Sequence, residues 1–437
     1  MKKKAAILGI GRSGESAAKL LHARGWLVTS LDSSACISVR TRMQSLAKEG
    51  ITSIIGADAD VDSTYYDLCV LSPGIQLESP IAQNILRKKI PIISEIELAF
   101  GECQAPIIAV TGTNGKTTTT KLIETLLNNC GVHAHACGNI GRPFSEIVIQ
   151  PQPNLHAVVL EVSSFQLETV HNFHPRIAVW LNLSQNHLDR YRSMEEYRQA
   201  KLRIFLNQTS EDFAVANAQE ALAIPAAKLI TFSVEDPTAD FIKKESQILF
   251  RGIPVFDQNR IPLYGNHNAE NLMAALATGY CLGLAFKDMA RALCLYLPLE
   301  HRCEFVCQRN GIYWINDSKS TNLDSLKKAI QSQPGPVVLI AGGKDKGFEF
   351  DILASLVKEK VKLAILIGEM RHRIAISWRS ISPQISETLE DAVYLAEKFS
   401  TIGDVVLFSP GTSSTDMFSD YEERGRYFKQ LVYSLPE

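Results

Sequence analysis

Short runs of apolar residues alternate with helix-like patterns from the start of the chain. Residues 5–9 form an apolar run, residues 15–24 repeat apolar positions at helical spacing, and residues 27–31 form a second run that ends at Asp32. Strand and helix patterns that alternate in this way are typical of a parallel α/β sheet. We therefore predict an α/β protein that begins with a Rossmann-like layer.

The alternation continues along the chain and indicates three domains. Further strands are expected at residues 68–71, 90–93, 107–110, 157–160, 177–181, 311–315, 337–340, 364–367 and 405–407, with a helix from near His267. The first domain is expected to end near residue 97, and residues 298–302 form the second junction. We predict domains over residues 1–97, 98–299 and 300–437, the last of them also Rossmann-like.

Composition and charge restrict the class of protein. The 437 residues fit three domains of roughly 150 residues each. Apolar residues make up 46% and charged residues 21%, as in folded globular proteins. The formal net charge of -2 gives no basic excess, so we do not expect nucleic acid as a partner.

The apolar segments and the cysteines point to a cytoplasmic protein. No run approaches the roughly 20 apolar residues that a membrane-spanning helix needs, and no membrane partner is expected. The N-terminal lysines followed by residues 5–11 resemble a signal peptide, but the apolar stretch ends at Arg12 and is better interpreted as a first strand. The nine cysteines include no CxxC pair, so we interpret them as reduced thiols.

The first candidate site is a glycine loop between a strand and a helix. Residues 9–14 read Gly-Ile-Gly-Arg-Ser-Gly, and Asp32 ends the following strand. Glycines in this pattern let main-chain amides approach a diphosphate at a helix N-terminus. The loop predicts an anion site, with a tight turn as the alternative and the ligand left open.

A second loop carries a sharper signal. Residues 111–118 read Thr-Gly-Thr-Asn-Gly-Lys-Thr-Thr, after one apolar strand and before a helical pattern. A Gly-Lys-Thr ending wraps amides around phosphates, places the lysine on them and offers a hydroxyl to Mg²⁺. The usual spacing has glycine where Val110 stands, so the loop is shortened. It predicts a P-loop ATPase-like central domain, with a glycine turn as the alternative.

Candidate metal-site residues follow in the same domain. Glu161 ends the strand at residues 157–160, where a carboxylate can reach a metal at the sheet edge, with a solvated strand end as the alternative. His187 could ligate a metal through neutral imidazole, although a lone histidine is more often structural. Lys201 lies on an expected amphipathic helix, where a lysine is ordinarily an exposed cation.

Polar loops after strands of the third domain complete the candidates. Residues 316–322, 342–347 and 409–414 combine Asp, Asn, Lys, Ser, Thr and Gly side chains. Ligand sites in α/β folds form at such strand ends, but ordinary loops are polar too.

Several of these motifs together resemble the Mur ligase family. They are the residue 111–117 loop, Glu-Val-Ser-Ser-Phe-Gln-Leu-Glu at 161–168, His-Leu-Asp-Arg-Tyr at 187–191, Gly-Asn-His-Asn at 265–268, His-Arg at 301–302 and Asn-Asp-Ser-Lys at 316–319. The match runs through all three domains in order. Residues 72–75, 161–168 and 409–424 look most like the branch of the family that adds D-glutamate.

The resemblance assigns a role to individual residues. It implies phosphate and nucleotide contacts for ATP at Gly112, Thr113, Asn114, Gly115, Lys116, Thr117, Thr118, Asn271, Arg302 and Asp317. It implies a UDP-substrate site, in place of a dinucleotide site, at Gly11, Arg12, Ser13, Gly14, Asp32, Gly74, Asn139 and His187. It implies D-glutamate contacts at Lys319, Thr321, Lys346, Ser414, Thr415 and Tyr421. It implies Mg²⁺ ligands at Thr117, Glu161, His187 and Lys201, the last as a carbamate.

The activity that the resemblance implies is an ATP-dependent, ADP-forming amide ligation. D-Glutamate would be joined to UDP-N-acetylmuramoyl-L-alanine through an acyl phosphate, in peptidoglycan precursor synthesis, with Lys116, His187 and Lys201 as catalytic residues. ATP and Mg²⁺ are the expected cofactors, and we expect a monomer. Asn186 departs from the aspartate usual before the histidine, and Thr415 and Tyr421 replace apolar or phenylalanine side chains of some relatives.

Three other interpretations stay open from the sequence. The first is another ligase of the same class, such as a different Mur ligase or a folylpolyglutamate synthetase. The second is an NAD-dependent oxidoreductase, which uses only the first glycine loop and Asp32 and leaves the Lys116 loop without a purpose. The third is a nucleotide-binding switch without catalysis.

Overall fold

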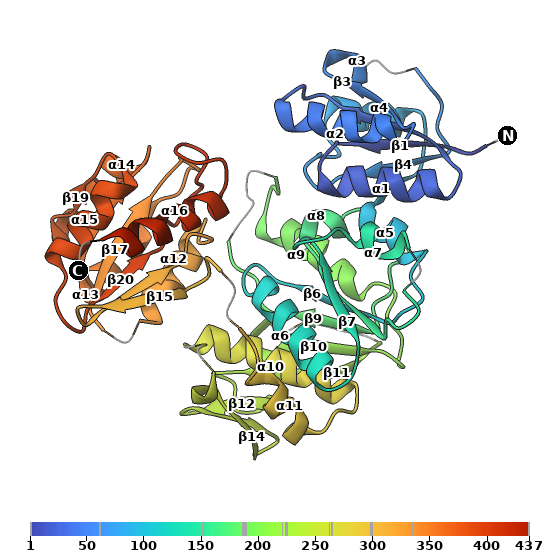
Figure 1. The fold of residues 1–437 in the computed structure, drawn as a ribbon. Coiled ribbons are helices and arrows are strands. Elements are labelled where there is room, and N and C mark those ends of the chain that lie inside the picture. Colours follow the sequence, from blue (N-terminus) through green and yellow to red (C-terminus); the bar gives the residue numbers. More distant parts are fainter. Residues whose placement is uncertain are drawn as a thin grey trace. The chain divides into compact units, whose positions relative to one another are not determined.

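The computed structural model describes residues 2–60, 63–150, 152–185, 190–220, 222, 226–261, 263, 265–297, 300–333 and 335–435. The chain forms two compact units, of which the first is Met1–Ile261 with Ala269–Tyr296. The second unit is Pro262–Asn268 with Leu297–Glu437. The first unit holds two β-sheets and the second holds one (Figure 1).

The N-terminal sheet has five parallel strands in the order β3-β2-β1-β4-β5, the Rossmann arrangement. Its strands are β1 (Lys4–Leu8), β2 (Leu27–Asp32), β3 (Thr52–Ile55), β4 (Leu68–Leu71) and β5 (Ile92–Ser94). Its helices are α1 (Arg12–Ala23), α2 (Ile37–Lys48), α3 (Ala57–Asp60), α4 (Pro80–Arg87) and α5 (Glu95–Phe100).

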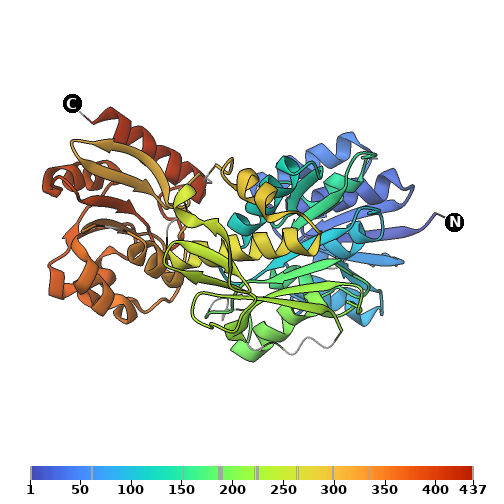
Figure 2. The ribbon, with the colours of Figure 1, turned by 90° about the horizontal axis from the view of Figure 1, so that it is seen from below.

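The central sheet has nine strands in the order β14-β13-β12-β11-β10-β9-β6-β8-β7, and β12 to β14 pair antiparallel (Figure 2). Its strands are β6 (Ile107–Thr111), β7 (Ala134–Gly138), β8 (Ala157–Glu161), β9 (Ile177–Trp180), β10 (Phe213–Asn217), β11 (Lys228–Ser233), β12 (Phe241–Lys244), β13 (Gln247–Phe250) and β14 (Ile253–Asp257). The helices of this part are α6 (Lys116–Asn129), α7 (Phe144–Val148), α8 (Ser164–Leu167), α9 (Met194–Leu202), α10 (Asn266–Cys281) and α11 (Phe286–Leu293).

The sheet of the second unit has six strands in the order β15-β16-β20-β17-β18-β19, and only the edge pair β15–β16 is antiparallel. Its strands are β15 (Glu304–Arg309), β16 (Ile312–Asn316), β17 (Val337–Gly342), β18 (Val361–Ile367), β19 (Gln384–Ile385) and β20 (Val405–Phe408). Its helices are α12 (Leu323–Gln331), α13 (Ala354–Lys360), α14 (Arg371–Ser377), α15 (Leu389–Phe399) and α16 (Tyr421–Ser434).

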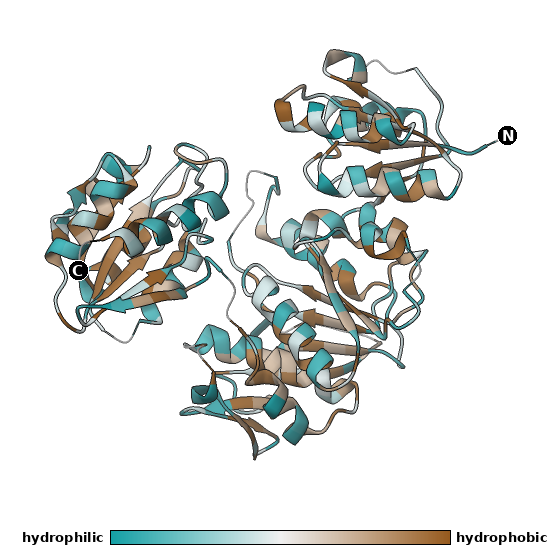
Figure 3. Cartoon of the chain, viewed as in Figure 1, coloured by the Kyte–Doolittle hydropathy of each residue, from teal (hydrophilic) through white to brown (hydrophobic). Residues whose placement is uncertain are grey.

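The apolar strand runs are buried on both faces of their sheets. In β1, Ala5 and Ile7 pack with α1 and α2, whereas Ala6 and Leu8 pack with α3 and α4. The strands of the second unit likewise separate α12, α13 and α14 from α15 and α16. Figure 3 shows the strands as the most hydrophobic ribbons. Parallel strands covered by helices on both faces need continuous apolar runs, not alternation.

The predicted α/β fold class is confirmed, and the strand predicted after the N-terminal lysines is β1. The domain limits at residues 97 and 299 stay predictions. Within the described ranges, no helix combines the length and the apolar content required to cross a bilayer.

Candidate active site

The phosphate loop joins β6 to α6, as the sequence predicted. Gly112 has φ +155° and Gly115 has φ +83°, a backbone that favours glycine. A Cβ on Gly115 would lie 2.3 Å from Oδ1 of Asn271, and one on Gly112 would lie 2.9 Å from Cβ of Leu181. Both glycines are therefore required by close contacts as well as by φ.

Neighbouring segments hold the loop in place. The Asn182 carboxamide accepts the Asn114 amide at 2.9 Å and donates to the Asn114 carbonyl at 3.2 Å. The Ser184 amide donates to the Thr113 hydroxyl at 3.0 Å. Lys116 Nζ donates to the Gly112 and Thr113 carbonyls, 2.9 Å from each. The loop is thus ordered in a form that keeps the lysine over its own main chain.

Glu161 lies where the sequence placed it, at the end of β8 beside the loop strand β6. Its side chain is buried, and Oε1 accepts a hydrogen bond from Asn139 Nδ2 at 2.9 Å. Its Oε2 is buried and, among the described residues, has no hydrogen-bond partner. A buried carboxylate oxygen left open in this way suits a cation.

Lys201 is buried, which is the opposite of what its helix pattern favoured. Its Nζ donates to the Gly112 carbonyl at 2.9 Å and lies 3.5 Å from the Thr111 hydroxyl. Burial lowers the pKa of Lys201 well below its usual range, the Lys116 cation lowers it further, and Glu161 opposes the shift. A lysine in this environment is readily neutral, and a neutral amine is the nucleophilic form.

Tyr197 supports both the loop and Lys201, one helical turn away. Its ring lies 4.8 Å from Lys201 Nζ, and its hydroxyl lies 3.3 Å from the Thr113 hydroxyl. The sequence interpretation missed this residue. The i, i+4 spacing of Tyr197 and Lys201 on α9 was the available signal, because side chains at that spacing meet on one face.

Of the remaining residues predicted for this site, three lie at the phosphate loop and two are outside the described residues. Thr117 and Thr118 are buried in the first turn of α6. Asn271 is buried beneath the loop and accepts a hydrogen bond from the Thr119 hydroxyl at 3.1 Å. His187, with Asn186 before it, lies outside the described residues.

The first glycine loop closes tightly on the N-terminal sheet. A Cβ on Gly14 would lie 1.9 Å from the Gly9 carbonyl oxygen, so glycine lets α1 pack against the loop. Gly11 is the N-cap of α1, Arg12 is exposed and Ser13 is half-buried. These positions leave the first amides of the helix directed at an incoming anion.

Asp32 also acts within the protein. Its Oδ2 accepts the Ile10 amide at 2.7 Å and its Oδ1 accepts the Ser34 amide at 2.9 Å. The Ser72 hydroxyl donates to the Gly9 carbonyl at 2.8 Å, which connects the end of β4 to the same loop. Gly74 lies just beyond, and a Cβ there would meet nothing within 4 Å. Asp32 therefore orders the loop in addition to any ligand contact.

In the second unit, three predicted loops converge at the carboxyl edge of the sheet. They follow β16, β17 and β20, which are neighbours. The Gly411 amide donates to the Ser320 carbonyl and the Lys344 amide to the Ser413 carbonyl, each at 2.9 Å. Thr321 and Ser414 are therefore carried on adjoining loops, and the exposed Lys346 and Thr415 lie two residues beyond this pairing.

Lys319 and Tyr421 meet directly in this unit. Lys319 Nζ donates to the Tyr421 hydroxyl at 3.1 Å and lies 4.8 Å from its ring. Arg424, which the sequence interpretation gave no role, is buried and donates to the Ser318 carbonyl at 2.8 Å and to the Thr412 carbonyl at 3.4 Å. Arg424 thus joins the loops that follow β16 and β20.

Asp317 and Arg302 lie together in the second unit. Asp317 accepts the Cys303 amide at 3.0 Å and the Ser409 hydroxyl at 2.7 Å. Burial raises the pKa of Asp317 to about 6, against the effects of these hydrogen bonds and of the Arg302 cation. The carboxylate is therefore largely ionised at neutral pH, and becomes protonated just below it.

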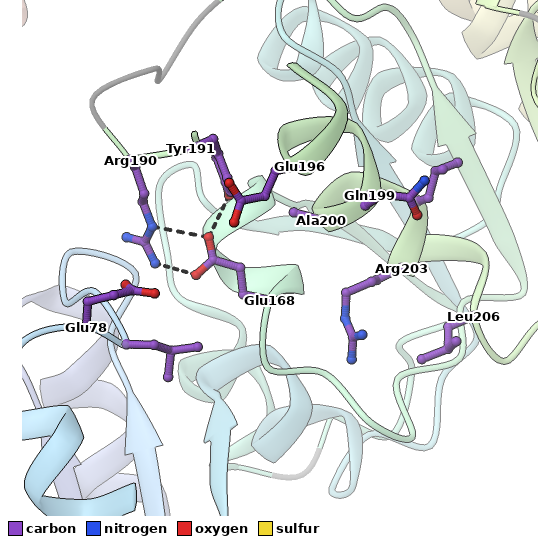
Figure 4. A pocket seen from close by; sticks show the side chains of 11 residues that line it. Glu78, Glu168, Arg190, Tyr191, Glu196, Gln199, Ala200, Arg203 and Leu206 are labelled. Carbon is purple, nitrogen blue, oxygen red and sulfur yellow. Dashed lines mark hydrogen bonds and ion pairs between the residues drawn. The ribbon is translucent and has the colours of Figure 1, made fainter. Parts of the chain in front are cut away.

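A cleft of about 510 Å³, lined by both charged and apolar side chains, lies beside α9 in the first unit (Figure 4). Its lining includes Glu168, Arg190, Tyr191 and Arg203 from the central part and Glu78 from the N-terminal part. Arg190 and Tyr191 both point at Glu168 in this view.

Three family models match the chain in order. They are described as Mur ligase MurD-like, N-terminal domain (residues 3–94), Mur ligase middle domain (residues 110–279) and Mur ligase, glutamate ligase domain (residues 301–411).

Curated relatives match over their whole length. The UDP-N-acetylmuramoylalanine--D-glutamate ligase of Geotalea uraniireducens (strain Rf4) is 41% identical over 448 residues, which cover 100% of this chain and 98% of the relative. The enzyme of the same name from Chlorobium chlorochromatii (strain CaD3) is 37% identical over 461 residues, with 98% of each chain covered.

Solved structures share the fold at lower identity. The UDP-N-acetylmuramate-alanine ligase MurC from Thermotoga maritima aligns over 99% of both chains with a TM-score of 0.62 and 21% identity. The MurF ligase from Thermotoga maritima in complex with ADP aligns over 93% of this chain and 95% of its own, with a TM-score of 0.61 and 16% identity. At these identities the likeness shows the three-domain fold alone.

Proposed function

Because the chain belongs to the Mur ligase family, we propose that it joins D-glutamate to UDP-N-acetylmuramoyl-L-alanine with conversion of ATP to ADP and phosphate. This is a step of peptidoglycan precursor synthesis, and we propose that the protein acts in the cytoplasm. The observation that carries the proposal is the phosphate loop set against the buried carboxylate of Glu161 and the buried amine of Lys201. Full-length likeness to D-glutamate ligases favours this reaction over the oxidoreductase and switch interpretations.

The chemistry requires activation of a carboxylate. An oxygen of the alanyl carboxylate attacks the γ-phosphorus of ATP, and the bond from that phosphorus to the β,γ-bridging oxygen breaks to release ADP. The neutral amine of D-glutamate then attacks the acyl carbon of the acyl phosphate, loses a proton and expels inorganic phosphate. Developing negative charge on the phosphoryl oxygens is the quantity that the protein has to stabilise.

We propose that Lys116 stabilises this negative charge on the phosphoryl oxygens. Its amine lies on the main chain of the phosphate loop, bonded to the carbonyls of Gly112 and Thr113. Exchange of these neutral acceptors for phosphate oxygens would be favourable, because a hydrogen bond between charged groups is stronger than one to a neutral carbonyl. The Thr113 and Asn114 amides already donate to Asn182, so we assign phosphate oxygens to the amides of residues 115–118 at the start of α6.

The donor set fits Mg²⁺. It offers the Thr117 hydroxyl and Glu161 Oε2, which no described residue hydrogen-bonds, and both are hard oxygen ligands. Mg²⁺ is ordinarily held by one or two protein groups together with phosphates, which is the kind of site that these two side chains could supply. Bound Mg²⁺ would neutralise charge on the β- and γ-phosphates. A carbamate on Lys201 would add an anionic oxygen, and His187 is a further candidate ligand.

Substrate residues complete the proposal. The first glycine loop, Asp32, Gly74 and Asn139 would hold the UDP-substrate, and Asn271, Arg302 and Asp317 would contact ATP. Lys319, Thr321, Lys346, Ser414, Thr415 and Tyr421 would hold D-glutamate, whose two carboxylates call for cations and hydroxyls. The adjoining loops of the second unit support that assignment. We propose a monomer as the active species.

The test is amino-acid-dependent phosphate release. Purified protein with ATP, Mg²⁺ and UDP-N-acetylmuramoyl-L-alanine is offered D-glutamate, L-glutamate and a panel of other D- and L-amino acids. We expect stoichiometric phosphate and a new amide only with D-glutamate, and loss of both in Lys116→Ala with UDP-substrate binding retained. Equal turnover with another amino acid, or normal turnover in Lys116→Ala, would refute the assignment.

A further inference from the structure

Arg190 connects the central part of the first unit to the loop that follows β4. Its Nη1 donates to the Pro73 carbonyl at 2.8 Å, and its Nη2 lies 3.5 Å from the Ile75 carbonyl. These two carbonyls flank Gly74. The guanidinium therefore spans the one glycine of this loop and holds the main chain on both sides of it.

The guanidinium has little freedom to move. Its Nε and Nη2 form a bidentate pair with the Glu168 carboxylate, at 3.1 and 2.5 Å. The Tyr191 hydroxyl donates to the same carboxylate at 2.6 Å, and the guanidinium carbon lies 4.1 Å from the Phe165 ring centre. Only 8% of the Arg190 side chain is exposed. A planar fork fixed on one side by a carboxylate presents its remaining donors in one direction.

The loop that Arg190 holds is also part of the first glycine loop's support. The Ser72 hydroxyl donates to the Gly9 carbonyl at 2.8 Å. A Cβ on Gly9 would lie 2.9 Å from Cγ1 of Ile75, so these segments are already in close contact. A displacement of residues 73–75 would consequently move the loop that carries Gly11 to Gly14.

On its other side, Arg190 leads to the phosphate loop. The ring centres of Tyr191 and Tyr197 are 5.1 Å apart. The Tyr197 hydroxyl reaches the Thr113 hydroxyl at 3.3 Å, and its ring lies against Lys201. A continuous set of contacts therefore runs from the first glycine loop through Arg190 to the phosphate loop.

Further contacts join the N-terminal and central parts away from this loop: α1 packs against α7, where the Ser145 hydroxyl donates to the Ser16 hydroxyl at 2.7 Å. Glu97 accepts hydrogen bonds from the amides of His171, Asn172 and Phe173 at 3.0, 2.7 and 2.9 Å. These bonds join α5 to the segment that follows α8. At the loop itself, a cleft of about 510 Å³ is lined by residues 77–78 on one side and by residues of α9 on the other (Figure 4).

We propose that Arg190, oriented by Glu168, is a positioning residue that sets the distance between the UDP-substrate loop and the phosphate loop. This inference rests on the proposed function. The UDP end of the substrate would be held at the N-terminal sheet, and its carboxylate lies at the other end of the molecule. Arg190 would keep that carboxylate at the correct distance from the γ-phosphoryl group of ATP bound at the central sheet. A misplacement of about 1 Å between reacting groups lowers rates by about a hundredfold, so such a spacer has a large effect.

The test compares Arg190→Lys and Glu168→Gln with a matched control. Arg203 lines the same cleft and donates to the Leu167 and Val170 carbonyls, both in the central part, and so Arg203→Lys loses similar bonds without loosening residues 73–75. We expect Arg190→Lys to raise KM for the UDP-substrate about tenfold and Glu168→Gln to raise it about threefold, since lysine lacks the fork and glutamine the charge. KM for ATP should stay within about twofold in all three variants.

Hydrogen exchange gives a readout that does not need turnover. Peptides covering residues 72–79 should exchange faster in Arg190→Lys than in the wild type, and at the wild-type rate in Arg203→Lys. Loss of register should also lower kcat, whereas a merely structural role would lower the fraction of active protein equally in Arg190→Lys and Arg203→Lys and leave each KM unaltered. Unchanged KM for the UDP-substrate with unchanged exchange at residues 72–79 in both test variants would overturn the inference. A wild-type protein without ligase activity would instead remove the proposed function, while the exchange comparison would still report on Arg190.

Discussion

Replacement of Gly115 by alanine separates backbone strain from contact in the phosphate loop. Gly115 is the N-cap of α6, with φ +83°, and Gly131 follows the other end of the same helix with φ +82°. A Cβ on Gly131 would meet nothing within 4 Å, whereas one on Gly115 would lie 2.3 Å from Oδ1 of Asn271. Gly131→Ala is therefore a control with equal strain and no collision.

The magnitudes follow from these two geometries. Left-handed backbone costs a residue with a Cβ about 1 kcal/mol, and both variants carry that loss. In Gly115→Ala, Asn271 must also withdraw by roughly 1 Å to reach an ordinary contact distance. That movement breaks its hydrogen bond from Thr119, worth about 1 kcal/mol, and displaces the loop amides. We expect nucleotide affinity to fall by about tenfold to a hundredfold in Gly115→Ala only.

Calorimetry with ADP and thermal unfolding together measure the two effects. Gly131→Ala should lower Tm by about 1–2 °C and bind ADP as the wild type does. Gly115→Ala should lose a similar or larger amount of stability and bind ADP weakly. Equal ADP affinity in the two variants would refute the claim that the Gly115–Asn271 contact shapes the phosphate loop.

Three further expectations concern titratable groups. Burial raises the pKa of Glu95, whose Oε2 has no partner among the described residues. The protonated carboxyl therefore contributes to folding stability below pH 4.5, and this contribution is lost as pH rises through the pKa of the folded state. Glu95→Gln should therefore raise Tm at pH 8 more than at pH 4, and an equal gain at both would contradict this. The exposed Cys36, with a pKa lowered to about 7 by the Ser34 and Ser38 hydroxyls, should be alkylated by iodoacetamide with a rate that rises through pH 7, which peptide mapping can follow. Lys201→Ala should lose ligase activity and regain part of it with added small carboxylates if the lysine acts as a carbamate, and full activity without any supplement would exclude that role.

The sequence alone predicted the structure best at positions where only one residue type tolerates the local backbone conformation. The phosphate loop needs glycine at φ +155° and +83°, and the strand and helix around it follow from apolar patterns. Strand 68–71 matches β4 at both ends because a buried parallel strand is one short apolar run. The edge strands β3 and β7 had no such run, since their outer positions are partly exposed or polar, and we did not predict them.

Interactions between distant segments could not be read from the sequence. The sequence showed Arg190 only as part of the motif at residues 187–191. Its hydrogen-bond acceptors at residues 73, 75 and 168 are distant in the sequence and come close to it only when the chain folds. The burial of Lys201 has the same origin, because its own helix pattern is that of a surface lysine. Asp32 was expected at a ligand, and its two bonds to main-chain amides depend on the path of the loop.

The most direct test of the central claim follows an oxygen atom. UDP-N-acetylmuramoyl-L-alanine labelled with ¹⁸O in its alanyl carboxylate is incubated with the protein, ATP, Mg²⁺ and D-glutamate, and the released phosphate is examined by mass spectrometry. Transfer of the terminal phosphoryl group of ATP to that carboxylate places one ¹⁸O in the phosphate for each amide formed. Unlabelled phosphate alongside normal amide formation would contradict the account.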